Sequence, residues 1–146
     1  MVCLGNICRS PMAEGVLTHK SDQNGLNYIV DSAGTAAYHV GEPPDPRMQM
    51  TAQKHGIDIS GQRARQFSLK DFDEFDVIYA MDQSNYHNIL HMAGTEEHKT
   101  KVKLLLNEFN PGSDMSVPDP WHGGDNGFEK VFQLVEAACD NIITNK

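Results

Sequence analysis

The chain has 146 residues, of which 39% are hydrophobic and 22% are charged, and its formal net charge is −8 at pH 7. This balance predicts one globular domain over residues 1–146 and argues against nucleic acid as a partner. No apolar run approaches the ~20 residues of a membrane-spanning helix, and no basic stretch followed by an apolar one suggests a secretion signal, so we expect no membrane partner.

The cysteines indicate a reducing compartment. The chain has three of them, Cys3, Cys8 and Cys139, which is an odd number without the spacing of an extracellular disulfide framework. We therefore expect reduced thiols and a cytoplasmic location.

The opening stretch, M-V-C-L-G-N-I-C-R-S-P, places the thiol of Cys3 six positions before Arg9. Gly5 and Asn6 belong to the residue types that most readily adopt a positive φ. Pro11 is well tolerated in the first turn of a helix, and a helical pattern follows it. The stretch therefore predicts a tight loop that leads into the N-terminus of a helix.

A loop of this kind suits an oxyanion. Backbone N–H groups turned inward and a helix N-terminus attract negative charge, and the planar fork of Arg9 can grip two oxygens of a phosphate. The same positive potential favours the thiolate of Cys3 as a nucleophile. In the alternative interpretation Cys3 is a small buried residue and Gly5-Asn6 an ordinary turn. The glycine, asparagine, serine and proline at suitable places in the same stretch favour the anion site over this alternative.

Strand-like and helix-like segments alternate after this loop. The strand-like segments, rich in β-branched and aromatic residues, are 27–32, 76–81 and 102–106. The helix-like segments are 11–20, 46–55, a short one at Asp71, 82–93 and 127–144. Alternation predicts an α/β fold with a parallel sheet and helices on both faces, whose ligands bind beyond the carboxyl ends of the strands. The opening loop and the loop 107–124 should meet at that edge.

The first strand is unusually short. Only Met1 and Val2 precede Cys3, whereas strands usually have about five or six residues. We expect a truncated first strand and a natural start upstream of Met1.

The loop 107–124 contains a candidate acid at Asp119, in V-P-D-P-W. Phosphoryl transfer to a thiolate needs a group that protonates the leaving oxygen, and a placed acid contributes typically about 10²–10⁴-fold. Pro118 and Pro120 stiffen the loop around this carboxylate, and Trp121 offers an aromatic wall. The alternative is a surface turn, because Asp-Pro is a common turn pair.

Together, C-L-G-N-I-C-R-S-P and D-P-W resemble the low-molecular-weight protein tyrosine phosphatases, as do D-S-A-G-T at 31–35, P-D-P-R at 44–47 and M-D-x-S-N at 81–85. The resemblance covers nearly the full length. It implies a three-layer fold with a four-stranded parallel sheet, and hydrolysis of phosphotyrosine without metal or cofactor. The implied partner is a phosphotyrosine-containing protein or a small aryl phosphate, and the implied state is a monomer.

The resemblance also implies roles for individual residues. Cys3 would form a phosphocysteine intermediate, Arg9 would bind the phosphoryl group, and Asp119 would act first as acid and then as base. The phosphate-binding loop would comprise Leu4, Gly5, Asn6, Ile7, Cys8 and Ser10, with the Ser10 hydroxyl bonded to the Cys3 sulfur.

Support for the loop is implied for Asn6 with Ser32 as its partner, and for Asp82 and Asn85. Capping of the following helix is an equally good interpretation of Asp82. A histidine that often joins this network in the family falls near Gln62 here, so that part of the resemblance does not carry over.

The implied substrate slot has aromatic and apolar walls: Tyr38, His39, Trp121 and His122, with Leu4 and Ile7 from the opening loop. A deep slot of this kind would favour phosphotyrosine over phosphoserine. His122 stands where many relatives have a second, phosphorylatable tyrosine, so that regulatory route is closed here. Glu42 at the rim should disfavour acidic peptides, unless it is simply a solvated charge.

The resemblance implies a reversible Cys3–Cys8 disulfide that protects the nucleophile from overoxidation. A buried, unpaired thiol is the alternative for Cys8, and we expect Cys139 to be core packing.

Three other functions compete with the phosphatase. An arsenate reductase of the same fold would need further cysteines in the middle of the chain, and none lies between Cys8 and Cys139. A phosphate-binding module without catalysis is disfavoured by the joint presence of nucleophile, arginine and acid. A zinc site could form from His87 and His91, four positions apart, with His98, but a solvated helix face is the favoured interpretation and we expect no metal.

Overall fold

The structure is a computed structural model that describes residues 1–122 and 126–145, apart from the side chain of His122. Four short strands form one parallel sheet in the order β2-β1-β3-β4. The strands are β1 Val2–Cys3, β2 Ala33–Gly34, β3 Ile78–Ala80 and β4 Val102–Leu104.

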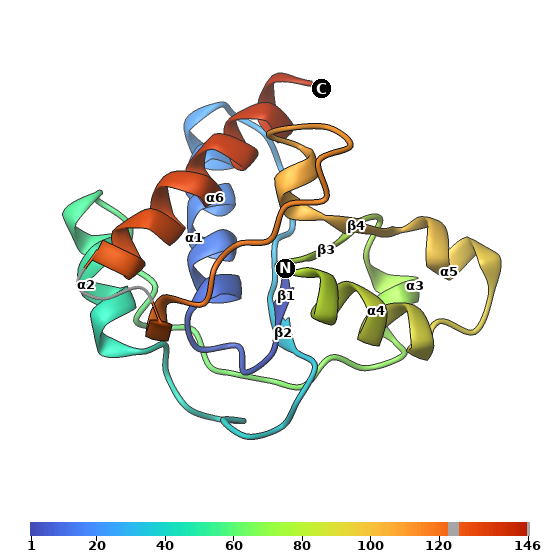
Figure 1. Cartoon of the computed structure of the whole chain (residues 1–146). Coiled ribbons are helices and arrows are strands. Elements are labelled where there is room, and N and C mark those ends of the chain that lie inside the picture. Colours follow the sequence, from blue (N-terminus) through green and yellow to red (C-terminus); the bar gives the residue numbers. More distant parts are fainter. Residues whose placement is uncertain (123–125, 146) are drawn as a thin grey trace.

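Helices cover both faces of the sheet, as the sequence predicted (Figure 1). The long α1 and α6 pack side by side with α2 on one face, and α3, α4 and α5 lie on the other. The α-helices are α1 Arg9–Gln23, α2 Pro46–Lys54, α3 Asp71–Glu74, α4 Gln83–Met92, α5 Glu96–Thr100 and α6 Gly127–Thr144. Two 3₁₀ turns, η1 Leu105–Asn107 and η2 Pro120–His122, complete the described elements. None of the helices in the described ranges is long and apolar enough to cross a membrane.

Each face of the sheet has its own apolar core. The first core joins β1 to α1, α2 and α6, and the second joins the sheet to Phe72 and to Ile89 of α4. The apolar stripe predicted for the last helix is buried along its whole length, including Cys139, which confirms that thiol as core packing. Burial raises the pKa of Cys139 to about 12, so it stays a neutral thiol.

The strand predicted over 27–32 is wrong, because β2 comprises only Ala33 and Gly34. The pairing of β1 with β2 starts at Val2 and Ala33, so the residues before Ala33 have no β1 residue beside them. The Met1 amine donates to the Asp31 carbonyl at 3.0 Å. A strand needs a partner for its backbone groups, and composition alone does not supply one.

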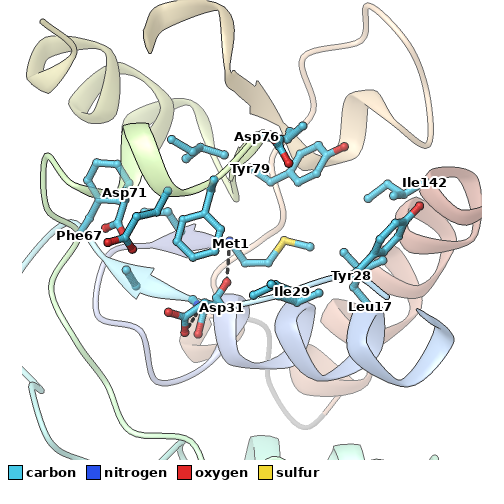
Figure 2. Close-up of a pocket in the computed structure, with 18 of the residues that line it drawn as sticks. Met1, Leu17, Tyr28, Ile29, Asp31, Phe67, Asp71, Asp76, Tyr79 and Ile142 are labelled. Atoms are coloured by element: carbon cyan, nitrogen blue, oxygen red, sulfur yellow. Dashed lines mark hydrogen bonds between the residues drawn. The ribbon is translucent and has the colours of Figure 1, made fainter. Parts of the chain in front are cut away.

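A cavity of about 370 Å³ lies at this amino end of the sheet. Its walls are the segments 27–33 and 74–79, and the side chain of Met1 projects into it (Figure 2). β1 is therefore short on the side away from its loop, as the sequence predicted for a two-residue strand.

The other predicted elements hold with small shifts. The third predicted strand ends at Leu104, where the chain turns into η1. Gly56 follows α2 with a φ of 77°, as expected of a residue that ends a helix. The sequence analysis missed α5, which Thr95 caps by accepting from the N–H of His98 at 3.1 Å.

Candidate active site

The opening loop lies at the carboxyl end of β1, between Cys3 and the start of α1 at Arg9. Two backbone hydrogen bonds from the segment after β2 hold this loop. Thr35 N–H donates to the Cys3 carbonyl at 2.9 Å, and Ala36 N–H donates to the Leu4 carbonyl at 3.0 Å. A Cβ atom at Gly34 would lie 2.7 Å from the Leu4 oxygen, so only glycine admits this approach. The D-S-A-G-T stretch thus shapes the wall of the loop.

Asn6 organises the inside of the loop. It has a φ of 59° and is buried, with 3% of its surface exposed. Its Nδ2 donates to Ser10 Oγ at 2.8 Å and to Ser32 Oγ at 2.9 Å, and its Oδ1 accepts from the N–H of Arg65 at 3.0 Å. The pair Asn6–Ser32 implied by the resemblance is therefore in contact, and the strained backbone is held by three bonds.

The sulfur of Cys3 has two polar neighbours. It lies 3.0 Å from Ser10 Oγ and accepts from the N–H of Asn6 at 3.3 Å. Because Asn6 Nδ2 already donates to Ser10 Oγ, the hydroxyl hydrogen of Ser10 is free to point at the sulfur. Both groups therefore offer hydrogens to the sulfur.

Arg9, at the start of α1, is held by two acceptors. Its Nη1 donates to Asp82 Oδ2 at 2.7 Å and to the Val117 carbonyl at 3.1 Å, and its side chain is only 10% exposed. The other oxygen of Asp82 accepts from the N–H of Asn85 at 2.7 Å and caps α4. Asp82 thus binds Arg9 through one oxygen and caps α4 through the other. Asn85 is buried, and its backbone N–H is the group that contacts Asp82.

The N-terminus of α1 adds its own donors. Cys8 occupies the N-cap position and offers no side-chain acceptor to the first N–H groups of the helix. The first turn also carries no acidic side chain. An oxyanion bound in the loop would be the acceptor these groups need.

Asp119 lies on the loop that enters η2. The start of this loop is tied to the sheet edge, where Val117 N–H donates to the Met81 carbonyl at 2.7 Å. The Asp119 side chain is exposed, and its Oδ1 accepts from the N–H of Trp121 at 3.0 Å. A Cβ atom at Gly127 would lie 2.7 Å from the Pro120 oxygen, so the loop packs closely on α6.

The pKa of the Cys8 thiol depends on charges around it. Burial, followed by the charges of Asp45, Cys3 and Asp119, raises the pKa of Cys8 to about 12, against an opposing contribution from the Trp121 side chain. The charge of Asp119 and the side chain of Trp121 thus both influence this thiol, and the placement of Asp119 at the phosphate loop stays a prediction. All three cysteines are free thiols, so the Cys3–Cys8 disulfide stays a prediction.

The residues predicted for the slot differ in their surroundings. His39 lies against the loop, since a Cβ atom at Gly5 would be 3.0 Å from its ring, and its Nδ1 is 2.9 Å from Glu42 Oε2. Trp121 and Leu4 are about half exposed, and Ile7 is half-buried. Tyr38 is 76% exposed, and the side chain of His122 lies outside the described residues.

Sequence analysis missed Arg47, which lies between the two loops. Its guanidinium carbon is 4.3 Å from the ring centroid of Trp121 and 4.7 Å from that of Phe128. The P-D-P-R stretch was the signal available, but it does not indicate that Arg47 contacts aromatic rings more than seventy positions away.

Gln62, in place of the family's usual histidine, donates from Nε2 to the Pro11 carbonyl at 3.1 Å.

The zinc site suggested by His87, His91 and His98 is wrong. The ring of His98 stacks on Phe72 at 4.8 Å and its Nε2 is 3.1 Å from Asp73 Oδ1. Within residues 1–122 and 126–145, no group of three histidine, cysteine, aspartate or glutamate side chains could hold a metal ion.

Comparison with known proteins agrees with this geometry. The family model described as low molecular weight phosphotyrosine protein phosphatase matches residues 1–145. A Synechocystis protein, provisionally named as a low molecular weight protein-tyrosine-phosphatase, is 49% identical over 99% of this chain and 92% of its own length.

Solved structures give the same result. A protein tyrosine phosphatase from Entamoeba histolytica, with Hepes in its active site, matches with a TM-score of 0.91 and 39% identity over 99% of this chain and 92% of its own. A Drosophila arginine phosphatase matches with a TM-score of 0.90 and 34% identity over 99% and 95%. The loop, the sheet and these matches together show that the chain belongs to the low molecular weight phosphotyrosine protein phosphatase family.

Proposed function

We propose that this protein hydrolyses phosphotyrosine through a phosphocysteine intermediate on Cys3. One observation carries the proposal: the Cys3 sulfur lies at the start of a loop that directs the Ser10 hydroxyl and the Asn6 N–H at it. A buried arginine fixed by two acceptors adjoins the same loop. These are the parts that a thiolate nucleophile and its dianionic substrate require.

In the first step the Cys3 thiolate attacks phosphorus, so that a sulfur–phosphorus bond forms and the bond to the tyrosine oxygen breaks. Asp119 gives its proton to the departing oxygen. The loop amides from Leu4 to Ser10 and the guanidinium of Arg9 stabilise the charge on the three equatorial oxygens. The bonds from Arg9 to Asp82 and Val117 both use Nη1, which leaves Nε and Nη2 for the phosphoryl group.

In the second step the Asp119 carboxylate takes a proton from water as the water oxygen attacks phosphorus. The sulfur–phosphorus bond breaks, inorganic phosphate leaves, and Cys3 returns to the thiolate. The Ser10 hydroxyl donates to the sulfur and makes it a better leaving group. All groups in this cycle come from the chain itself, so we propose that it needs no metal and no cofactor.

Support for an aromatic substrate comes from the groups around the loop. Trp121, His39 and Leu4 offer ring and apolar surface for the ring of phosphotyrosine. A phosphorylated serine holds its phosphate on a shorter stem and would leave these surfaces uncovered. The substrate class we propose is therefore a phosphotyrosine-containing protein or a small aryl phosphate. We propose that the protein acts on it as a monomer.

The test is turnover of p-nitrophenyl phosphate by reduced protein, followed by peptides carrying phosphotyrosine, phosphoserine or phosphoarginine. We expect turnover of the aryl ester and the phosphotyrosine peptide without added metal, and a loss of at least about 10⁴-fold for Cys3→Ser. Retention of activity by Cys3→Ser would reject the mechanism. Preference for phosphoarginine would redirect the substrate class towards that of the Drosophila relative, and arsenate-dependent oxidation of thiols would favour the reductase.

A further inference from the structure

We propose that Arg47, held in place by Asp45, positions the loop that carries Asp119, and so is a positioning residue for the general acid. The inference rests on the proposed phosphatase function. It concerns a series of contacts that begins at the phosphate loop and ends at the Asp119 carboxylate.

The first contact in this series joins the phosphate loop to Asp45. The N–H of Asp45 donates to the Ile7 carbonyl at 2.8 Å, and the Asp45 side chain is 7% exposed. Its Oδ1 accepts from the backbone N–H of Arg47 at 2.8 Å, so it caps α2. Asp45 is therefore fixed relative to the loop that would hold the phosphoryl group.

The second part joins Asp45 to Arg47 through two side-chain bonds. Nε of Arg47 donates to Asp45 Oδ1 at 3.2 Å, and Nη2 donates to Oδ2 at 3.0 Å. Burial alone would raise the pKa of Asp45, but the hydrogen bonds from Arg47 outweigh it and lower that pKa, so the pair is ionised. A bidentate bond fixes the plane of the guanidinium as well as its position.

The third part joins Arg47 to the acid loop. The guanidinium lies against Trp121 and Phe128, with its carbon 4.3 Å and 4.7 Å from the two ring centroids. Phe128 is buried in α6, whereas Trp121 belongs to η2 and is 56% exposed. Stacking on the guanidinium thus ties a largely exposed ring to a fixed surface.

The last contact reaches the carboxylate. The N–H of Trp121 donates to Asp119 Oδ1 at 3.0 Å, so the position of the Trp121 backbone sets that of the exposed acid. The start of the loop is already tied at Val117, by its bonds to Met81 and Arg9. At the other end Arg47 supplies a tie through Trp121, next to the close packing of Pro120 on Gly127. A displacement of about 1 Å between reacting groups can cost as much as about 10²-fold in rate.

A purely structural role for Arg47 would predict a different pattern of loss. If Arg47 only stabilised α2 or the core, its removal would slow all substrates by the same factor. If it positions the acid, its removal should slow substrates in proportion to their need for a proton. Phenyl phosphate has a poor leaving group and depends on the acid, whereas p-nitrophenyl phosphate depends on it much less.

The experiment compares Arg47→Met with Arg63→Met, because Arg63 is an exposed arginine whose side chain, among the described residues, donates to the backbone carbonyls of Ser60 and Gln62. We expect Arg47→Met to lose roughly 10–30-fold in kcat/KM, which reports the first step and not the shared second step, on phenyl phosphate but only about 2–3-fold on p-nitrophenyl phosphate. Arg63→Met should match the wild type on both. Equal losses on the two substrates would overturn the proposal.

A double variant separates this inference from the proposed function. In an Asp119→Asn background, Arg47→Met should cause no further loss of kcat/KM on phenyl phosphate, because the group it positions is absent. An additional loss of the full size would show that Arg47 acts elsewhere. If Asp119→Asn itself had no effect, the proposed function of Asp119 would fail first. Arg47→Lys, which keeps the charge but not the fork, should fall between the wild type and Arg47→Met and serves as the readout if Arg47→Met unfolds.

Discussion

At the carboxyl end of β1 the buried polar groups pair with one another, whereas at its amino end the chain surrounds a cavity of about 370 Å³. The carboxyl end holds Asn6, Ser10 and Ser32 in one network, which continues to Glu14 through a 2.7 Å bond from the Ser32 hydroxyl. At the amino end, the segment before Ala33 lies outside the pairing of β1 and β2.

This difference separates function from stability within one short strand. Changes at the carboxyl end should alter turnover, with effects on stability only where a buried group loses its partner. Changes at the amino end should alter stability and leave turnover intact. Four predictions follow this division, in order of decreasing size.

The largest effect is expected for Arg9→Lys. A lysine at this position keeps a charge but loses the planar fork that can hold Asp82 and a phosphoryl group together. We expect kcat/KM on p-nitrophenyl phosphate to fall by about 10³-fold, which corresponds to about 4 kcal/mol. Arg63→Lys is the matched control and should leave the rate unchanged. A loss below about tenfold would show that the fork is not used.

The next effect is expected for Asn6→Ala, which acts on stability as well as rate. Alanine with a φ near the 59° of Asn6 is strained by about 1–2 kcal/mol, and the buried groups left without Asn6 cost about 1–3 kcal/mol more. We expect the free energy of unfolding, from urea titration, to fall by about 2–5 kcal/mol.

Asn6→Gly divides this effect into its two parts. Glycine removes the strain but not the lost bonds, so it should lose about 1–2 kcal/mol less than alanine while sharing the fall in activity. Equal stabilities of the alanine and glycine variants would show that the backbone at this position is not strained.

The sequence predicted best what depends on neighbours along the chain. The loop 3–10 and the last helix follow from short spacings, so they could be predicted before any fold was known. The pairing of Asn6 with Ser32 could be predicted only through the resemblance to a family.

What the sequence missed depends on partners distant in the chain. Arg47 meets Trp121 and Phe128 only after α2 and α6 have packed, so no local pattern indicates its role. The segment 27–32 has the composition of a strand, but strand formation depends on a neighbour that β1 does not provide.

At the amino end, an engineered extension ahead of Met1 should stabilise the fold. Several alternating valine and isoleucine residues would lengthen β1 between the segments 27–33 and 74–79 and fill the cavity seen in Figure 2. We expect a rise of roughly 3–6 °C in melting temperature, because the buried side chains and the added backbone hydrogen bonds to both neighbouring segments together offset the entropy of ordering the added residues. A glycine-serine extension of equal length is the control, and kcat should not change in either. No difference between the two extensions would show that the cavity does not accept a strand.

The smallest effect concerns the charge of the Met1 amine. Burial lowers the pKa of this amine from its usual 8.0, against the opposing influence of Glu14 and Asp31. The folded protein therefore binds this proton less readily than the unfolded chain, and the free energy of unfolding should rise with pH until about pH 8, above which both states are neutral. Met1 as a whole is half-buried, so the slope should stay well below the limit of about 1.4 kcal/mol per pH unit for one proton.

Acetylation of the amine isolates this contribution. The acetylated chain keeps an N–H that can donate to the Asp31 carbonyl, as the amine does at 3.0 Å, but it carries no titratable charge there. Titrating groups that do not interact with the amine contribute equally to both forms and cancel in the difference, whereas Glu14 and Asp31 are coupled to it. Urea unfolding of the two forms from about pH 6 to about pH 9 should show the acetylated protein more stable at the acidic end, with the two converging above about pH 8. A difference that is constant across this range, or that grows with pH, would show that the amine keeps its charge in the folded protein without cost.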